Sequence, residues 1–193
     1  MYEIPEAECP TTWRALCAVT EELGFDMPSD ARTGALLRTL AASKPGGRLL
    51  ELGTGTGLAT SWLMDGMDAS ARLISVDHDD RVQSVARQFL GGDPRVDFVL
   101  GDGVRFLRQQ PSMSFDLVFA DAWPGKYDAR DIALALVKPG GLYIGDDMLP
   151  QANWPEGHQP RVNRLLQELR NARDWAVVAP AWASGLVIAA RRC

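Results

Sequence analysis

The chain has 193 residues and 46% of them are hydrophobic, which suits a single domain with a full apolar core that needs no disulfide or metal to hold it together. Acidic side chains outnumber basic ones by 25 to 20, and the formal net charge of −5 argues against nucleic acid as a partner. The three cysteines form no CxxC pair and no apolar stretch reaches the ~20 residues of a membrane span, so we expect a reduced, cytoplasmic protein without a membrane segment.

The N-terminal segment is acidic and interrupted by prolines, unlike a secretory signal. Two helices are predicted after it, at residues 11–23 and 31–42. Ser29 or Asp30 is suited to cap the second of them. The apolar face of the first helix could cover a binding site, form the interface of a homodimer or belong to the ordinary core.

From residue 46 onward, short apolar runs alternate with helical stretches, the pattern typical of parallel strands buried between two layers of helices. Strands are predicted at 49–52, 73–76, 96–100, 117–120, 142–144, 175–178 and 186–190. Helices are predicted at 58–64, 81–90, 103–109, 129–137 and 161–172. Only a short turn separates the last two strands, so the final strand should run antiparallel to its predecessor in a β-hairpin.

These elements predict an α/β fold: a Rossmann-like, doubly wound, seven-stranded sheet that is mostly parallel and has an antiparallel last strand. No linker or internal repeat divides the chain, so residues 1–193 are expected to form a single domain. Within it, the N-terminal helices of residues 1–45 would cover the ligand-binding side of a core formed by residues 46–193.

A glycine-rich turn, ELGTGTG at residues 51–57, joins the first strand of this core to the next helix. Glycines at such a turn let a ligand approach the backbone and the N–H groups of the helix start. The dinucleotide fingerprint G-x-G-x-x-G fails in both registers, because Leu58 and Thr60 stand where its last glycine would be. The spacing present is E-x-G-x-G-x-G, which resembles the class I S-adenosylmethionine-dependent methyltransferases.

This resemblance implies S-adenosylmethionine as the cofactor. It implies that Glu51 helps to orient the amino group of the cofactor. The backbone of Gly53, Thr54, Gly55 and Gly57 would lie against the methionine part of the cofactor. The alternative is a turn that only packs a helix on a strand.

Further acids follow the next two strands, at their carboxyl ends, where open α/β sheets bind ligands. Asp77 lies at about the 20-residue offset expected of a ribose-binding acid, and its carboxylate can accept two ribose hydroxyls. His78 beside it could touch adenosine or be an exposed loop residue. Asp102 and Gly103 follow the third strand. The resemblance implies that Asp102 accepts a hydrogen bond from the adenine amino group. Alternatively, Asp102 only caps the N-terminus of the following helix.

Asp121 follows the fourth strand, and Asp146 and Asp147 follow the fifth, which should be its neighbour in the sheet. Three adjacent carboxylates repel one another unless a cation or a proton neutralises them, and oxygen ligands suit Mg²⁺. The arrangement is similar to catechol O-methyltransferase and the caffeoyl-CoA-type O-methyltransferases. That family uses an acid, an acid and an amide to hold a metal that activates a catechol hydroxyl. Here the acid Asp147 stands in place of the family's amide and makes the site more anionic. Asp146 and Asp147 could instead only stabilise the following loop.

The family also places a general-base lysine three residues after the first metal acid, where this chain has Pro124. Lys126 comes two residues later. If Pro124 and Gly125 turn the loop inward, Lys126 could still act as the base. If the loop length is fixed by Tyr127, Lys126 points elsewhere, and His158 becomes another candidate.

The sequence thus predicts a methyltransferase acting on a small phenolic or catechol-like hydroxyl, with Asp121 and Lys126 as catalytic residues and Mg²⁺ as a second cofactor. The acidic chain without an added domain favours a small acceptor over nucleic acid or protein. The displaced lysine and the acid at Asp147 leave open a metal-independent enzyme acting on an amine or another acceptor. A non-catalytic cofactor-binding protein is the third reading.

Overall fold

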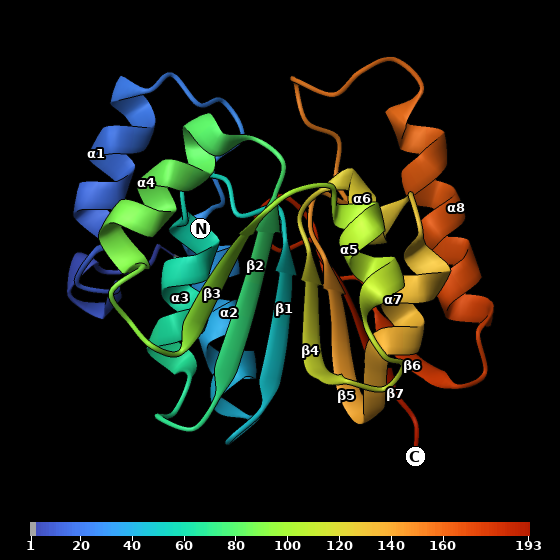
Figure 1. The fold of residues 1–193 in the computed structure, drawn as a ribbon. Coiled ribbons are helices and arrows are strands. Elements are labelled where there is room, and N and C mark those ends of the chain that lie inside the picture. The colour runs from blue at the N-terminus through green and yellow to red at the C-terminus, as the bar shows by residue number, and fades with distance from the viewer. Residues whose placement is uncertain (1–2) are drawn as a thin grey trace.

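A computed structural model describes residues 3–193, and within them a seven-stranded sheet lies between two layers of helices (Figure 1). The strands are β1 (Arg48–Leu52), β2 (Arg72–Asp77), β3 (Val96–Leu100), β4 (Phe115–Ala120), β5 (Val137–Gly145), β6 (Trp175–Val178) and β7 (Val187–Arg191). The helices are the short 3₁₀ turn η1 (Glu6–Glu8), α1 (Trp13–Glu22), α2 (Ala31–Ala42), α3 (Leu58–Gly66), α4 (Asp80–Leu90), α5 (Gly103–Gln109), α6 (Trp123–Lys126), α7 (Arg130–Leu136) and α8 (His158–Asn171). Residues 1 and 2 of the predicted 1–45 segment lie outside the described part.

The strand order is β3-β2-β1-β4-β5-β7-β6. β7 runs antiparallel to both of its neighbours, β5 and β6, and the other neighbouring pairs are parallel. The predicted mostly parallel, doubly wound sheet with an antiparallel last strand is therefore confirmed. Because the order reverses between β1 and β4, the carboxyl ends of these two strands form the crevice in which such sheets bind ligands.

Helices α1 to α4 cover one face of the sheet and α5 to α8 cover the other (Figure 1). Alternate residues of each central strand supply the two apolar layers: Leu49 and Phe119 pack under the first group of helices, Leu50 and Val118 under the second. All four side chains have no exposed surface. The runs of consecutive apolar residues in the sequence reflect this burial on both faces. Within the described residues, no helix combines the length and hydropathy needed to cross a membrane.

Three short polar side chains set where helices begin. Asp30 caps α2 and Asp79 caps α4, each accepting a backbone N–H two residues later. Asp102 caps α5 by accepting the N–H of Arg105 at 2.7 Å. These bonds satisfy donors that have no partner within the first turn of a helix. Of the two predicted caps for α2, Asp30 is the one used, and Ser29 is free for another contact.

Three of the differences from the predicted elements lie at a proline. α8 begins at His158, before Pro160, because a proline in the first turn of a helix costs no hydrogen bond. β5 begins at Val137 and includes the Pro139 segment, which passes Phe115 and Leu117 of β4 with a shift of register. α6 was not predicted, because its Pro-Gly pair indicates a turn.

Helices α2 and α3 approach closely because glycines lie at their contact. A Cβ atom on Gly34 would lie 2.2 Å from the Trp62 ring, and one on Gly66 would lie 2.1 Å from the carbonyl oxygen of Arg38. Such distances require the neighbouring helix to move. Trp62 itself has no exposed surface, so its ring has little room to turn away.

We therefore expect Gly34→Ala to lower the free energy of unfolding by about 2 kcal/mol, although alanine is the better helix former. Urea unfolding followed by circular dichroism measures this. The matched control is Gly92→Ala, where a Cβ atom would meet nothing within 4 Å. If the two variants were equally stable, the tight contact between α2 and α3 would be refuted.

Candidate active site

The glycine-rich turn after β1 has a backbone that other residues could not easily adopt. Gly53, Gly55 and Gly57 have φ of 98°, 52° and 92°, in the left-handed region that glycine favours. A Cβ atom on Gly53 would lie 2.6 Å from the carbonyl oxygen of Asp121, and one on Gly57 would lie 2.8 Å from Cβ of Ala86. The turn is thus in direct contact with the end of β4 and with α4.

Glu51, in β1, is fully buried beneath this turn. The hydroxyls of Thr60 and Ser75 donate to its Oε2 at 2.6 and 2.5 Å, while its buried Oε1 has no hydrogen-bond partner among residues 3–193. Burial raises the pKa of Glu51 to about 7, although the two hydroxyls oppose that rise. A buried carboxylate oxygen without a partner is available to a donor from a ligand or a water molecule.

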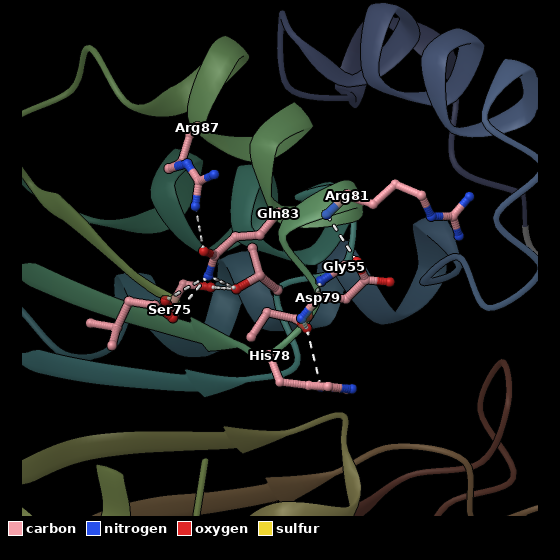
Figure 2. Close-up of polar contacts among 10 residues, drawn as sticks. Gly55, Ser75, His78, Asp79, Arg81, Gln83 and Arg87 are labelled. Atoms are coloured by element: carbon pink, nitrogen blue, oxygen red, sulfur yellow. Dashed lines mark hydrogen bonds and ion pairs between the residues drawn. The ribbon is translucent and has the colours of Figure 1, made fainter. Parts of the chain in front are cut away.

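A chain of polar side chains continues from Glu51 toward α4. Gln83 donates to Thr54 Oγ1 at 3.1 Å, Thr54 and Ser75 share a hydrogen bond of 2.6 Å, and Ser75 donates to Glu51. Figure 2 shows Arg87 directed at Gln83, to which it donates at 2.8 Å. Sequence reasoning missed Ser75 and Gln83. The available signal was a polar residue within the apolar strand ISVD and another on the buried face of α4.

The structure places Asp77 at the end of β2, facing the glycine turn. Its Oδ2 accepts the N–H of Gly55 at 2.8 Å, and its Oδ1 accepts the N–H of Asp79 at 2.9 Å. The side chain is only 10% exposed, and each oxygen keeps a further acceptor position. His78 is 86% exposed, and its Nδ1 lies 3.6 Å from Asp77 Oδ1 (Figure 2).

Asp102 and Gly103 lie at the start of α5, against the loop that follows β4. A Cβ atom on Gly103 would lie 2.7 Å from Cβ of Pro124, so glycine is needed for this contact. Asp102 acts as the N-cap, one of its two predicted roles. Its other predicted role, toward adenine, stays a prediction.

Asp121 and Asp146 form an acidic pair at the ends of β4 and β5, where Asp146 is buried and Asp121 is partly buried. Asp121 Oδ2 accepts from Ser29 at 3.1 Å, and Asp146 Oδ1 accepts from the hydroxyl of Ser184 and, at 2.7 Å, from the N–H of Asp147. Burial, reinforced by the neighbouring Asp146 charge, raises the pKa of Asp121 well above its usual range. Burial and the charge of Asp147 raise the pKa of Asp146 to about 6.

Lys126 points into this acidic pair, and its side chain is 4% exposed. Pro124 and Gly125 have the backbone angles of a type II turn, which carries the loop inward, one of the two alternatives left open above. A Cβ atom on Gly125 would lie 2.3 Å from Leu52, so the turn requires glycine. The Lys126 ammonium donates to the carbonyl oxygen of Asp146 at 2.9 Å and lies 3.6 Å from Asp147 Oδ2.

The predicted Mg²⁺ site does not fit this arrangement. Within residues 3–193, no group of three His, Cys, Asp or Glu side chains is placed to hold a metal ion. The carboxylates of Asp121 and Asp146 are engaged by serine hydroxyls, and Asp147 faces the Lys126 ammonium. The expectation that the three acids hold one metal ion therefore stays a prediction, and the lysine ammonium beside Asp146 and Asp147 does not favour it.

His158 is the first residue of α8, and its Nε2 shares a hydrogen bond of 2.9 Å with the Tyr127 hydroxyl. The Trp154 ring packs on it at a centroid distance of 4.3 Å. Burial, together with the Lys126 charge, lowers the pKa of His158, so its imidazole is neutral near pH 7. These contacts hold the His158 ring in place, and its buried Nδ1 has no hydrogen-bond partner in the described part of the chain.

Comparison with known proteins agrees with this geometry. A family model described as a methyltransferase domain matches residues 50–148, just over half of the chain. A protein of Mycobacterium avium named "Putative O-methyltransferase" is 30% identical over 151 residues, which are 73% of this chain and 67% of the relative. An O-methyltransferase of Bacillus cereus in complex with S-adenosylhomocysteine superposes with a TM-score of 0.82 and 20% identity, covering 98% of this chain and 93% of that one. An O-methyltransferase of Streptomyces achromogenes in complex with S-adenosylmethionine has a TM-score of 0.80 and 22% identity, covering 100% and 92%.

Proposed function

The chain belongs to the class I S-adenosylmethionine-dependent O-methyltransferases, and we propose that it methylates a hydroxyl group of a small phenolic or catechol-like acceptor. The observation that carries this proposal is the contact between the glycine turn and Asp121. In support, the backbone carbonyl of Asp121 lies against Gly53 of this turn, so the residue whose carboxyl has a raised pKa is next to the turn against which the cofactor is proposed to lie.

We assign cofactor binding to the turn and to the acids at the neighbouring strand ends. The backbone at Gly53, Thr54, Gly55 and Gly57 would lie against the methionine part, and the unpaired Glu51 Oε1 offers an acceptor beneath it. The further set comprises Asp77 for the ribose hydroxyls, His78 and Asp102 with Gly103 for adenosine, and Asp121 at the methyl end. When bound, S-adenosylmethionine supplies an electrophilic methyl group on a positively charged sulfur.

Asp77→Asn is expected to weaken S-adenosylhomocysteine binding about tenfold or more. The amide has one acceptor oxygen in place of two, so it cannot hold Gly55, Asp79 and two ribose hydroxyls together. Isothermal titration calorimetry measures the change. Asp97→Asn, on the exposed side of β3, is the control. Equal affinity of both variants would remove Asp77 from the cofactor site.

Chemistry at this site requires a group that accepts the proton of the acceptor hydroxyl. Asp121 suits this role, because burial and Asp146 raise its pKa toward the range that general-base catalysis needs near neutral pH. The Ser29 hydroxyl holds the carboxylate in position at 3.1 Å. No further catalytic group is needed, because displacing a neutral thioether from a sulfonium depends mainly on positioning and desolvation.

The proposal is tested by incubating the protein and S-adenosylmethionine with a panel of phenols, vicinal diols and amines, and detecting methylated products by mass spectrometry. We expect O-methyl ethers from the phenolic or catechol-like members. Methylation of the amines alone would establish the N-methyltransferase reading instead. Cofactor binding without any product across the panel would favour the non-catalytic reading.

We further propose that residues 1–193 form one methyltransferase domain, with the segment 1–45 over the ligand-binding side of the core. In support, Thr20 of α1 shares a hydrogen bond of 2.7 Å with Thr56 of the glycine turn. Ser29, between α1 and α2, reaches Asp121. A cytoplasmic location and a homodimer stay predictions.

A further inference from the structure

Lys126 is a buried cation surrounded by acids. Its ammonium lies 3.6 Å from Asp147 Oδ2 and donates to the carbonyl oxygen of Asp146, and its charge acts on the carboxyls of both Asp121 and Asp146. A charged side chain is rarely buried unless opposite charges or hydrogen bonds compensate the lost hydration. The acids after β4 and β5 supply that compensation.

The loop after β4 is built to hold this lysine in place. Pro124 fixes the φ angle of the first turn position. Only glycine fits at the second position, because a Cβ atom on Gly125 would lie 2.3 Å from Leu52 Cδ1. The Tyr143 hydroxyl, at the centre of β5, donates to the carbonyl oxygen of Gly125 at 2.9 Å. Tyr143 has no exposed surface. The hydrogen bond from β5 thus holds the turn in place, and the turn positions the Lys126 side chain.

We propose that the Lys126 ammonium takes the place of a divalent metal ion in this protein. It neutralises the acidic cluster of Asp121, Asp146 and Asp147 and prevents a metal from binding there. This first part rests on the geometry alone. It follows from charge, because a divalent ion among these acids would be repelled by the ammonium, which already lies 3.6 Å from Asp147 Oδ2.

The second part rests on the proposed function: Lys126 stabilises the acceptor oxygen while methyl transfer proceeds. The hydroxyl proton passes to the Asp121 carboxylate, and the oxygen forms the new bond to the methyl carbon. The electron pair of the broken carbon–sulfur bond remains on sulfur, giving a neutral thioether. Lys126 takes no part in proton transfer and acts only as a positive charge near the oxygen. A metal ion stabilises the oxygen in the same way in related reactions.

Manganese titration followed by electron paramagnetic resonance tests the first part, because bound Mn²⁺ loses the signal of the free ion. The wild-type protein should leave Mn²⁺ free up to about 1 mM, and Lys126→Ala should bind it at least about tenfold more tightly, since three acids then lack their cation. Lys138→Ala is the control, because Lys138 pairs with Asp116 away from the site. Lys126→Gln serves as a second variant, and circular dichroism establishes that each variant is folded.

Tight Mn²⁺ binding by the wild type that Asp121→Asn abolishes would overturn the proposal. So would folded Lys126 variants that bind Mn²⁺ no better than the wild type. The titration needs neither cofactor nor acceptor, so its outcome is independent of the methylation panel. For the second part, wild-type turnover should be unchanged by EDTA, and loss of turnover that added Mg²⁺ restores would contradict it.

Discussion

Asp121→Asn should lower kcat roughly 100- to 1,000-fold on an acceptor that the wild type methylates, because an amide cannot accept the hydroxyl proton. Binding of S-adenosylhomocysteine should change little, since this product carries no charge on sulfur. The substitution is close in shape, and Ser29 can still donate to the amide oxygen. Initial rates and calorimetry on the same preparation separate the effect on chemistry from the effect on binding.

The matched control is Asp128→Asn, which makes the same chemical change on an exposed residue of the same loop. It should retain nearly wild-type turnover. If Asp121→Asn lost affinity for S-adenosylhomocysteine by the same factor as it lost turnover, Asp121 would be a cofactor-binding residue only, and another group would have to accept the proton.

Glu51→Gln should become more stable relative to the wild type as the pH rises, by about 3 kcal/mol in total. The pKa of Glu51 rises from 4.5 to about 7 on folding. Below pH 4.5 the Glu51 carboxyl is protonated in both the folded and the unfolded protein, so it does not lower the free energy of unfolding. Between pH 4.5 and 7 the unfolded chain releases this proton while the folded protein keeps it, so wild-type stability falls. Above pH 7 the loss of wild-type stability is constant. The rise in the pKa of Glu51 on folding corresponds to a loss of about 3 kcal/mol in the free energy of unfolding.

Glutamine does not ionise, so the variant avoids this loss. Urea unfolding of both proteins without cofactor, at about pH 5 and pH 8, measures the difference. Glu156→Gln, at an exposed glutamate, is the control and should track the wild type at both pH values. A difference between Glu51→Gln and wild type that does not depend on pH would show that Glu51 is ionised in the folded protein.

The fold was predictable because the strands are short apolar runs. In addition, a capping side chain or a glycine stands just before the first residue of α2, α3, α4, α5 and α8. α2, β3, α5 and β6 have the predicted bounds. The antiparallel last strand followed from the lack of room for a helix between β6 and β7. The largest differences lie at the prolines at 124, 139 and 160, because local preference treats proline as a break while tertiary packing can include it.

The candidate acids were also predictable, since they follow strands whose carboxyl ends meet at one edge of the sheet. The partners of these acids were not, because Ser29, Ser75 and Ser184 come from distant parts of the chain. The spacing between Asp121 and Lys126, compared with that of the family, left two possible directions for the Lys126 side chain. The angles at Gly125 decide between them, and such angles depend on the contact with Leu52.

The most direct test of cofactor use is a calorimetric titration of the wild-type protein with S-adenosylhomocysteine and, separately, with NAD. We expect one bound S-adenosylhomocysteine per chain and no heat from NAD, because the turn lacks the last glycine of the dinucleotide fingerprint. Binding of NAD, or no binding of S-adenosylhomocysteine by the folded protein, would contradict the assignment to S-adenosylmethionine-dependent methyl transfer.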